Sequence, residues 1–72
     1  MEQQNPQPQE EFVPGLANGH HYMAQLGYCV GGPWSIELIH VEGQAPLSGL
    51  EMRWSTRAEA VQAADKLVAA LP

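Results

Sequence analysis

The sequence has few basic residues and only one cysteine, and each shortage excludes a class of function. Its 72 residues contain three Lys or Arg and eight Asp or Glu, which gives a formal net charge of −5. Three cations are too few to neutralise a run of phosphates, so nucleic-acid binding is disfavoured, and a small nucleic-acid-binding protein is kept only as an alternative. The single cysteine, Cys29, excludes an internal disulfide.

The negative charge is concentrated near the N-terminus. Glu2, Glu10 and Glu11 lie in the first eleven residues, which leaves five acids, three bases and a net charge of −2 for residues 12–72. That balance is ordinary for a small domain and does not by itself indicate a strongly basic partner.

The sequence also lacks any long apolar run. Its hydrophobic content is 44% and its charged content 15%, values that favour a globular fold over a disordered chain. No stretch has the length of a transmembrane helix, and the polar N-terminus is unlike a secretory signal. We therefore expect a cytoplasmic protein without membrane contact, in a bacterial or phage context.

Two parts of the chain differ in composition. Residues 1–11 are rich in Gln, Pro and Glu and carry no apolar side chain after Met1, which is typical of a disordered tail. Residues 12–72 are predicted to form a single small α+β domain. It starts with a predicted loop over residues 12–19, because Pro14-Gly15 and Asn18-Gly19 are dipeptides common in turns.

Residues 55–71 give the clearest secondary-structure signal, that of an amphipathic helix. Thr56 and Glu59 have the spacing of a capping box, in which each side chain accepts a hydrogen bond from the other residue's backbone amide. The segment contains six alanines, and no Gly or Pro interrupts it before Pro72. Apolar residues at helical spacing predict one buried stripe, made of Val61, Ala64, Leu67 or Val68, and Leu71.

Three segments upstream show the two-residue period of half-buried strands. Residues 21–30 alternate clearly, Gly31-Gly32 permits a tight turn into residues 34–41, and a short third strand is predicted within residues 50–54. The predicted fold is α+β, a three-stranded antiparallel β-meander packed on one C-terminal α-helix in the order βββα. The sheet residues assigned to the helix side are Leu26, Tyr28, Ile36, Leu38, Leu50, Met52 and Trp54.

The side chains of transition-metal ligand type are His20, His21, Cys29 and His40. Their spacing matches no closed zinc pattern, and strand alternation puts His21 and Cys29 on one face of the sheet with His40 on the other. We therefore predict no metal site. Cys29 is interpreted as a small half-buried apolar residue rather than as a nucleophile.

No motif of an enzyme or cofactor site is found. Gly27 and Gly32 have the spacing of a phosphate loop, but Pro33-Trp34 stands where Lys-Ser/Thr is required. Trp34 and Trp54 are predicted as core residues rather than as a base-stacking platform, because no basic cluster surrounds them. We predict no catalytic residue and no cofactor, and a minimal metal-binding or enzymatic domain is the least favoured alternative.

The leading prediction is a non-enzymatic protein-interaction or regulatory module. One helix covers one face of the sheet, and alternation leaves Met23, Cys29, Ile39 and Val41 on the other face as a candidate partner surface. We expect a protein partner or a second copy, as in a homodimer, bound through that face or through an edge strand. The competing expectation is that residues 12–19 fold over these side chains and complete the core.

Overall fold

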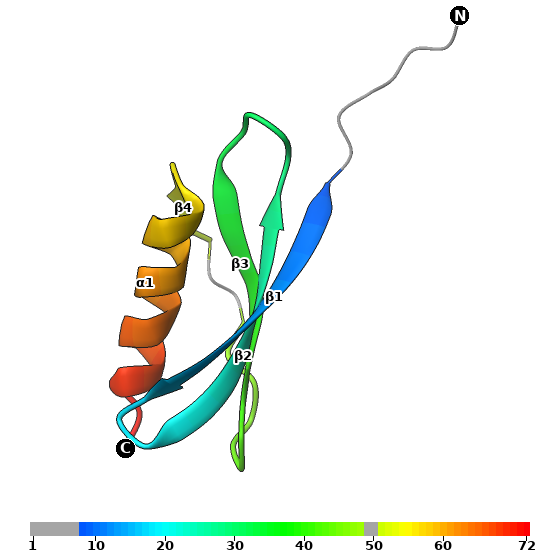
Figure 1. The fold of residues 1–72 in the computed structure, drawn as a ribbon. Helices are drawn as coiled ribbons and strands as arrows, with labels where there is room; N and C mark the ends of the chain where they lie inside the picture. The colour runs from blue at the N-terminus through cyan, green and yellow to red at the C-terminus, as the bar shows by residue number, and fades with distance from the viewer. Residues whose placement is uncertain (1–7, 49–50) are drawn as a thin grey trace, which may run out of the picture.

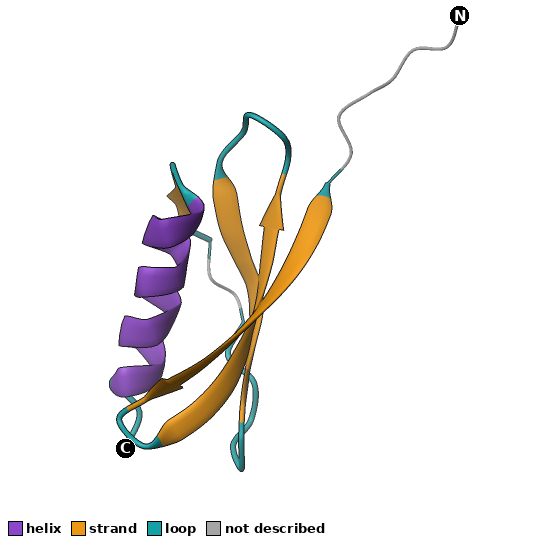
Figure 2. Cartoon of the chain, viewed as in Figure 1, coloured by secondary structure: helices purple, strands orange, loops and turns teal. Residues whose placement is uncertain are grey.

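An antiparallel sheet curls around one helix in the computed structural model, which describes residues 8–48 and 51–72 (Figure 1). The sheet order is β1-β2-β3-β4, and α1 lies along one face, as Figure 2 shows. The α+β class and the C-terminal helix are confirmed, but the prediction of three strands is wrong because the sheet has four. The elements are β1 (Gln9–Ala17), β2 (His20–Tyr28), β3 (Trp34–Val41), β4 (Arg53–Trp54) and α1 (Arg57–Ala69).

The additional strand is β1, which occupies the segment predicted as a loop. Asn18 and Gly19 have φ values of 51° and 81° and form the two-residue turn between β1 and β2. Positive φ at both positions is the type I′ geometry that Asn-Gly favours, and its twist matches that of a hairpin. The loop prediction for residues 12–19 is therefore wrong. Residues 9–11, assigned to the tail, also belong to β1, and residues 1–7 lie outside the described part.

Pro14 is compatible with β1 because of its place on the ladder. The two-residue turn makes Ala17 and His20 a hydrogen-bonded pair, and such pairs alternate along an antiparallel ladder. The backbone of Pro14 therefore faces away from β2, at the free edge of the sheet, where a missing N–H costs no ladder bond. Gly15 faces α1, where an added Cβ would overlap the ring of Tyr22.

A β-bulge at Glu37 changes the alternation along β3. Gln25 pairs with Leu38 and Leu26 pairs with Ile36, so Glu37 has no partner on β2. An extra residue reverses the direction of every side chain that follows it. Ile36, Ile39 and Val41 are consequently all buried on the helix side. The prediction that Ile39 and Val41 lie on the other face is wrong, as is the assignment of Leu38 to the helix side.

The strand predicted within residues 50–54 is shorter in the structure. β4 consists of Arg53 and Trp54, which pair with Ser35 and Trp34 of β3. Leu47 forms a separate bridge to Ile39, with both backbone hydrogen bonds at 2.9 Å. Leu50 lies outside the described residues.

The predicted capping box of α1 is confirmed. Thr56 Oγ1 accepts a hydrogen bond from the amide of Glu59 at 3.2 Å, and Glu59 Oε1 accepts from the amide of Thr56 at 3.3 Å. The buried residues of α1 are Ala60, Ala64 and Val68, one turn apart, whereas Leu67 is 36% exposed. Of the two alternatives in the predicted stripe, Val68 is therefore the buried one. In the described ranges, no helix has the length and apolar character needed to cross a membrane.

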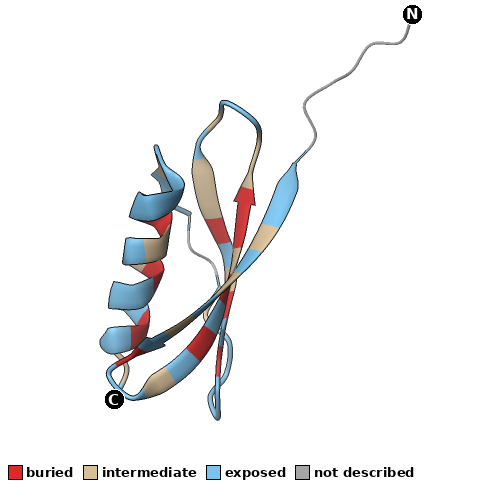
Figure 3. Ribbon diagram, in the orientation of Figure 1, coloured by how far each residue is buried: buried red, intermediate tan, exposed pale blue. Residues whose placement is uncertain are grey.

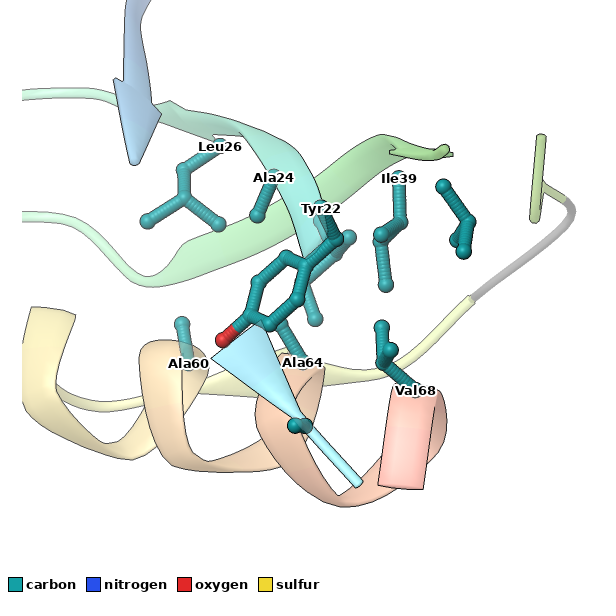
Figure 4. Packing of buried hydrophobic residues seen from close by; sticks show 10 residues of the cluster. Tyr22, Ala24, Leu26, Ile39, Ala60, Ala64 and Val68 are labelled. Carbon is teal, nitrogen blue, oxygen red and sulfur yellow. The ribbon is translucent and has the colours of Figure 1, made fainter. Parts of the chain in front are cut away.

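The hydrophobic core lies between α1 and the concave side of the sheet. Buried positions on the strands and on the helix face each other in Figure 3, and Figure 4 shows Val68 and two helical alanines opposite the side chains of β2 and β3. Four of the ten core residues are alanine, so the helix approaches the sheet closely. The core residues are Ala17, Tyr22, Ala24, Leu26, Ile36, Ile39, Val41, Ala60, Ala64 and Val68.

Candidate interaction surface

The face of the sheet directed away from α1 is referred to below as the open face. Strand pairing arranges its side chains in rows that run across the sheet. Nearest the Asn18-Gly19 turn is the row of Leu16, His21 and Glu42; then come Pro14, Met23 and His40; then Phe12, Gln25 and Leu38; and last Glu10, Gly27, Ser35 and Arg53. The segment 12–19 is thus part of the sheet and does not fold over this face.

Apolar side chains on the open face follow β1 and extend onto β2 and β3. Phe12 is 53% exposed, Leu16 58% and Met23 38%, and all three belong to neighbouring strands. Pro14 is exposed and Leu38 is half-buried on the same face. We refer to Phe12, Pro14, Leu16, Met23 and Leu38 as the apolar band. Several exposed apolar side chains gathered on one face of a small domain are typical of an interaction site.

The end of the open face farthest from the Asn18-Gly19 turn is charged. A hollow of about 460 Å³ lies there, with Glu10, Glu37, Ser35, Cys29 and Arg53 among its lining residues. Ser35 donates to Glu37 Oε2 at 3.0 Å, and Gln25 donates to Glu10 Oε2 at 3.2 Å. The Glu37 carboxylate lies directly over Gly27, in the space that a Cβ would occupy.

The opposite end of the open face carries imidazoles. His21, His40 and Glu42 line a hollow of about 330 Å³ together with Met23. The prediction that His21 and His40 lie on opposite faces is wrong, because the bulge at Glu37 brings His40 to the same side. In residues 8–48 and 51–72, no three His, Cys, Asp or Glu side chains are placed so that they could hold a metal ion.

The four residues predicted as the partner surface separate in the structure. Met23 lies in the centre of the open face, and Cys29 is a half-buried free thiol just beyond the end of β2. Ile39 and Val41 are 0% and 5% exposed in the core. Sequence reasoning missed Phe12 and Leu16, although Asn-Gly after a segment of alternating apolar residues is a hairpin signal.

A second apolar surface lies between α1 and the segment leading into β4. It is a hollow of about 280 Å³. Met52 lies beside α1 there, on the side to which it was assigned, but its side chain is 64% exposed rather than buried. Trp54 also lines it but packs partly against the core. The other lining residues are Ala63, Lys66, Leu67 and Ala70.

The second tryptophan, Trp34, is also half-buried against the core. Its ring stacks on Tyr28 with the ring centres 4.1 Å apart and the planes at 17°. Stacked geometry of this kind adds to the stability that burial provides. The prediction that both tryptophans are core residues is therefore correct only in part.

Two polar contacts tie the covered face of the sheet to α1. Tyr22 donates its hydroxyl to Asp65 Oδ1 at 2.8 Å, and burial together with this bond raises the pKa of Tyr22 to about 12. Arg57 Nη2 lies 2.7 Å from Glu11 Oε2, and the hydrogen bond from Arg57 lowers the pKa of Glu11 below its usual value. Both contacts hold the helix in place, and neither uses a residue of the open face.

Comparison with protein-family models, with curated proteins and with solved structures finds no match.

Proposed function

We propose that the chain is a non-enzymatic protein-interaction or regulatory module and that the open face is its binding surface. The observation that carries the proposal is the exposure of Phe12 and Leu16, each more than half accessible, on the same face as Met23. Full burial of a large apolar side chain contributes roughly 1.5 to 3 kcal/mol, so covering the exposed halves of these residues adds on the order of 1 kcal/mol each.

The position of Pro14 favours packing against the open face over strand addition at β1. β1 is an edge strand, and the backbone groups of Phe12, Pro14 and Leu16 face outward from the sheet. Proline offers no N–H, so a strand added at this edge would lose a hydrogen bond at its centre. The side chains of the apolar band have no such restriction.

The basic residues give no comparable support to nucleic-acid binding. Arg57 is engaged by Glu11, Lys66 lies on the helix beside the second hollow, and Arg53 is at the charged end of the open face. Cations separated in this way do not follow a phosphate backbone. A cytoplasmic location remains part of the proposal, and the free thiol of Cys29 is compatible with a reducing compartment.

A pair of matched variants tests the proposal. Leu16→Glu places a charge in the apolar band, whereas Val30→Glu makes the same kind of change at a residue that is 83% exposed in the β2–β3 turn. We expect Leu16→Glu to weaken association by about tenfold or more, as a charge introduced at an apolar contact does, and Val30→Glu to leave it unchanged.

Association is measured in two ways with the untagged protein. Sedimentation velocity over a concentration series reports self-association, and capture from the native host with wild-type and variant baits reports other partners. Circular dichroism confirms that each variant is folded. A wild-type protein that stays monomeric and captures the same proteins as Leu16→Glu would contradict the proposal.

A further inference from the structure

We propose that the partner of the open face is a second copy of this chain, packed face to face about a two-fold axis that runs along the strands between β2 and β3. This inference rests on the proposed function and adds the identity of the partner and the arrangement of the two copies. Its basis is that the polar groups at both ends of the open face are placed as such an axis requires.

With a two-fold axis in this direction, each row of side chains in one copy faces the same row in the other copy. The strands, in contrast, face different strands. β2 of one copy faces β3 of the other, and β1 faces the position of β4. In a symmetric dimer every such contact occurs twice. The open face must therefore carry complementary groups at mirror positions across the sheet.

Both end rows of the open face meet that condition. In the row farthest from the Asn18-Gly19 turn, Glu10 is on β1 and Arg53 is on β4, so each faces the other residue of the second copy. In the row nearest the turn, His21 is on β2 and Glu42 follows β3, and these two also exchange. The opposite charges of Glu10 and Arg53 at facing positions set the orientation of an interface, and an imidazole facing a carboxylate offers a hydrogen-bond partner to it.

Arg53 is available for such a contact. Its guanidinium donates to the backbone carbonyl of the adjacent Met52 at 3.4 Å, and the one ion pair in the described part of the chain joins Arg57 to Glu11. Glu10 accepts a hydrogen bond from the neutral side chain of Gln25 at 3.2 Å.

The middle rows place apolar side chains opposite uncharged polar ones, and two prolines opposite each other, in the same arrangement. Met23 faces His40, and Leu38 faces Gln25, across the axis. Pro14 of β1 lies over Pro46, because the bridge of Leu47 to Ile39 places the neighbouring Pro46 on the open face beside β3. Phe12 lies next to it, over Ser48.

A two-fold axis across the strands is less favourable. It would place each strand opposite the same strand of the second copy and reverse the order of the rows. Glu42 of one copy would then face Ser35 and Glu37 of the other, and Leu16 would face Glu10. Such a packing opposes carboxylates and buries a charge against an apolar side chain, both of which are costly. The axis along the strands avoids these contacts. Its one unfavourable contact is between the Glu37 carboxylates of the two copies, which lie beside the axis.

The size of the open face predicts a weak, reversible dimer. The open face is about 14 Å wide, because it has three long strands spaced about 4.8 Å apart. It is about 26 Å long, because β3 has 8 residues that each rise roughly 3.3 Å. Two copies then bury about 700 Å² in flat projection, and somewhat more with side-chain relief, which is below the roughly 1,200 to 2,000 Å² of stable complexes. The dimer should therefore depend on protein concentration.

A charge-exchange experiment tests the arrangement by sedimentation equilibrium. Glu10→Arg places two cations together in each of the two Glu10–Arg53 contacts of the dimer, and Arg53→Glu places two anions together there. We expect each variant alone to bind itself about five- to tenfold more weakly than wild type. An equimolar mixture of the two variants, and the double variant Glu10→Arg/Arg53→Glu, should both recover association because opposite charges face each other again.

Two further variants complete the experiment. Lys66→Glu reverses a charge on the helix side and should leave the dimer unchanged. Glu37→Gln removes the carboxylates that approach each other beside the axis and should tighten the dimer. Circular dichroism of each variant separates a lost contact from a lost fold.

The outcomes distinguish this inference from the proposed function. If Leu16→Glu prevents self-association but the charge variants and their mixture behave as wild type, the open face binds a second copy in another arrangement and this inference is wrong. If the wild type is monomeric at millimolar concentration, the second copy is wrong as the partner. The proposed function then stands only if Leu16→Glu abolishes capture of another protein.

Discussion

The two faces of the sheet use apolar side chains in opposite ways. On the covered face, β2 contributes Tyr22, Ala24 and Leu26, which are 7%, 1% and 0% exposed. On the open face the same strand contributes Met23, which is 38% exposed beside Phe12 and Leu16 of β1. On the covered face, small residues allow α1 to approach the sheet closely and bury the side chains there. On the open face, large apolar side chains remain exposed.

This contrast shows which apolar side chains folding leaves exposed. Alanines at Ala24, Ala60 and Ala64 contribute little apolar area, so the core gains its stability from close contact and a few larger side chains. Phe12, Leu16 and Met23 hold apolar area that folding does not use. In the proposed function, a binding partner would remove that area from water.

The sharpest test of the contrast compares two adjacent residues of β3. Ile39→Ala removes a fully buried side chain and should lower the free energy of unfolding by about 2 to 5 kcal/mol. Leu38→Ala, on the open face, should cost about 1 kcal/mol or less, since its side chain is only half-buried. Urea denaturation measures both. The reverse order would mean that β3 has no bulge at Glu37.

The polar contact between β2 and α1 on the covered face should have a smaller effect. Tyr22→Phe removes the hydrogen bond to Asp65 and should lower stability by about 1 kcal/mol at neutral pH. The pH dependence of this stability difference is a more specific test of the Tyr22 environment. The pKa of Tyr22 is about 12 in the folded chain, against 10.0 for an ordinary tyrosine, so the unfolded chain ionises first as the pH rises.

The contribution of Tyr22 is therefore complete below pH 10 and is lost between pH 10 and pH 12. Thermal unfolding of wild type and Tyr22→Phe across this range should show the difference between them shrinking as the pH rises. A difference that stays constant would mean that the tyrosine hydroxyl has no special environment in the fold.

The Thr56 cap should affect only the stability of α1 and of its packing on the covered face. Thr56→Ala removes the acceptor of the Glu59 amide and should lower the free energy of unfolding by about 1 kcal/mol. Ser55→Ala is the control, because only the backbone of Ser55 contacts Glu59. Self-association should not change in either variant, since α1 is on the other side of the sheet.

Local signals predicted the helix and β2 well. The capping box of Thr56 and Glu59 depends on residues three apart, and β2 alternates without interruption, so both could be read from short windows. Met23 was placed on the open face for this reason.

The errors come from features that depend on pairing between strands. Leu38 and Ile39 are both apolar, so the sequence of β3 fits either face, and only its register with β2 reveals the bulge. Pro14-Gly15 was interpreted as a turn, although Pro14 is acceptable in a strand whose edge is free. With β1 missed, Phe12 and Leu16 were missed as well.

The position of α1 after all four strands has a consequence during synthesis on the ribosome. When residues 9–41 have left the exit tunnel, the nascent chain holds strands with two apolar faces and no helix to cover either. The face that α1 later occupies is then as exposed as the apolar band. Until the segment with Ala60, Ala64 and Val68 emerges, this intermediate is open to chaperones and to premature contact between neighbouring chains on a polysome.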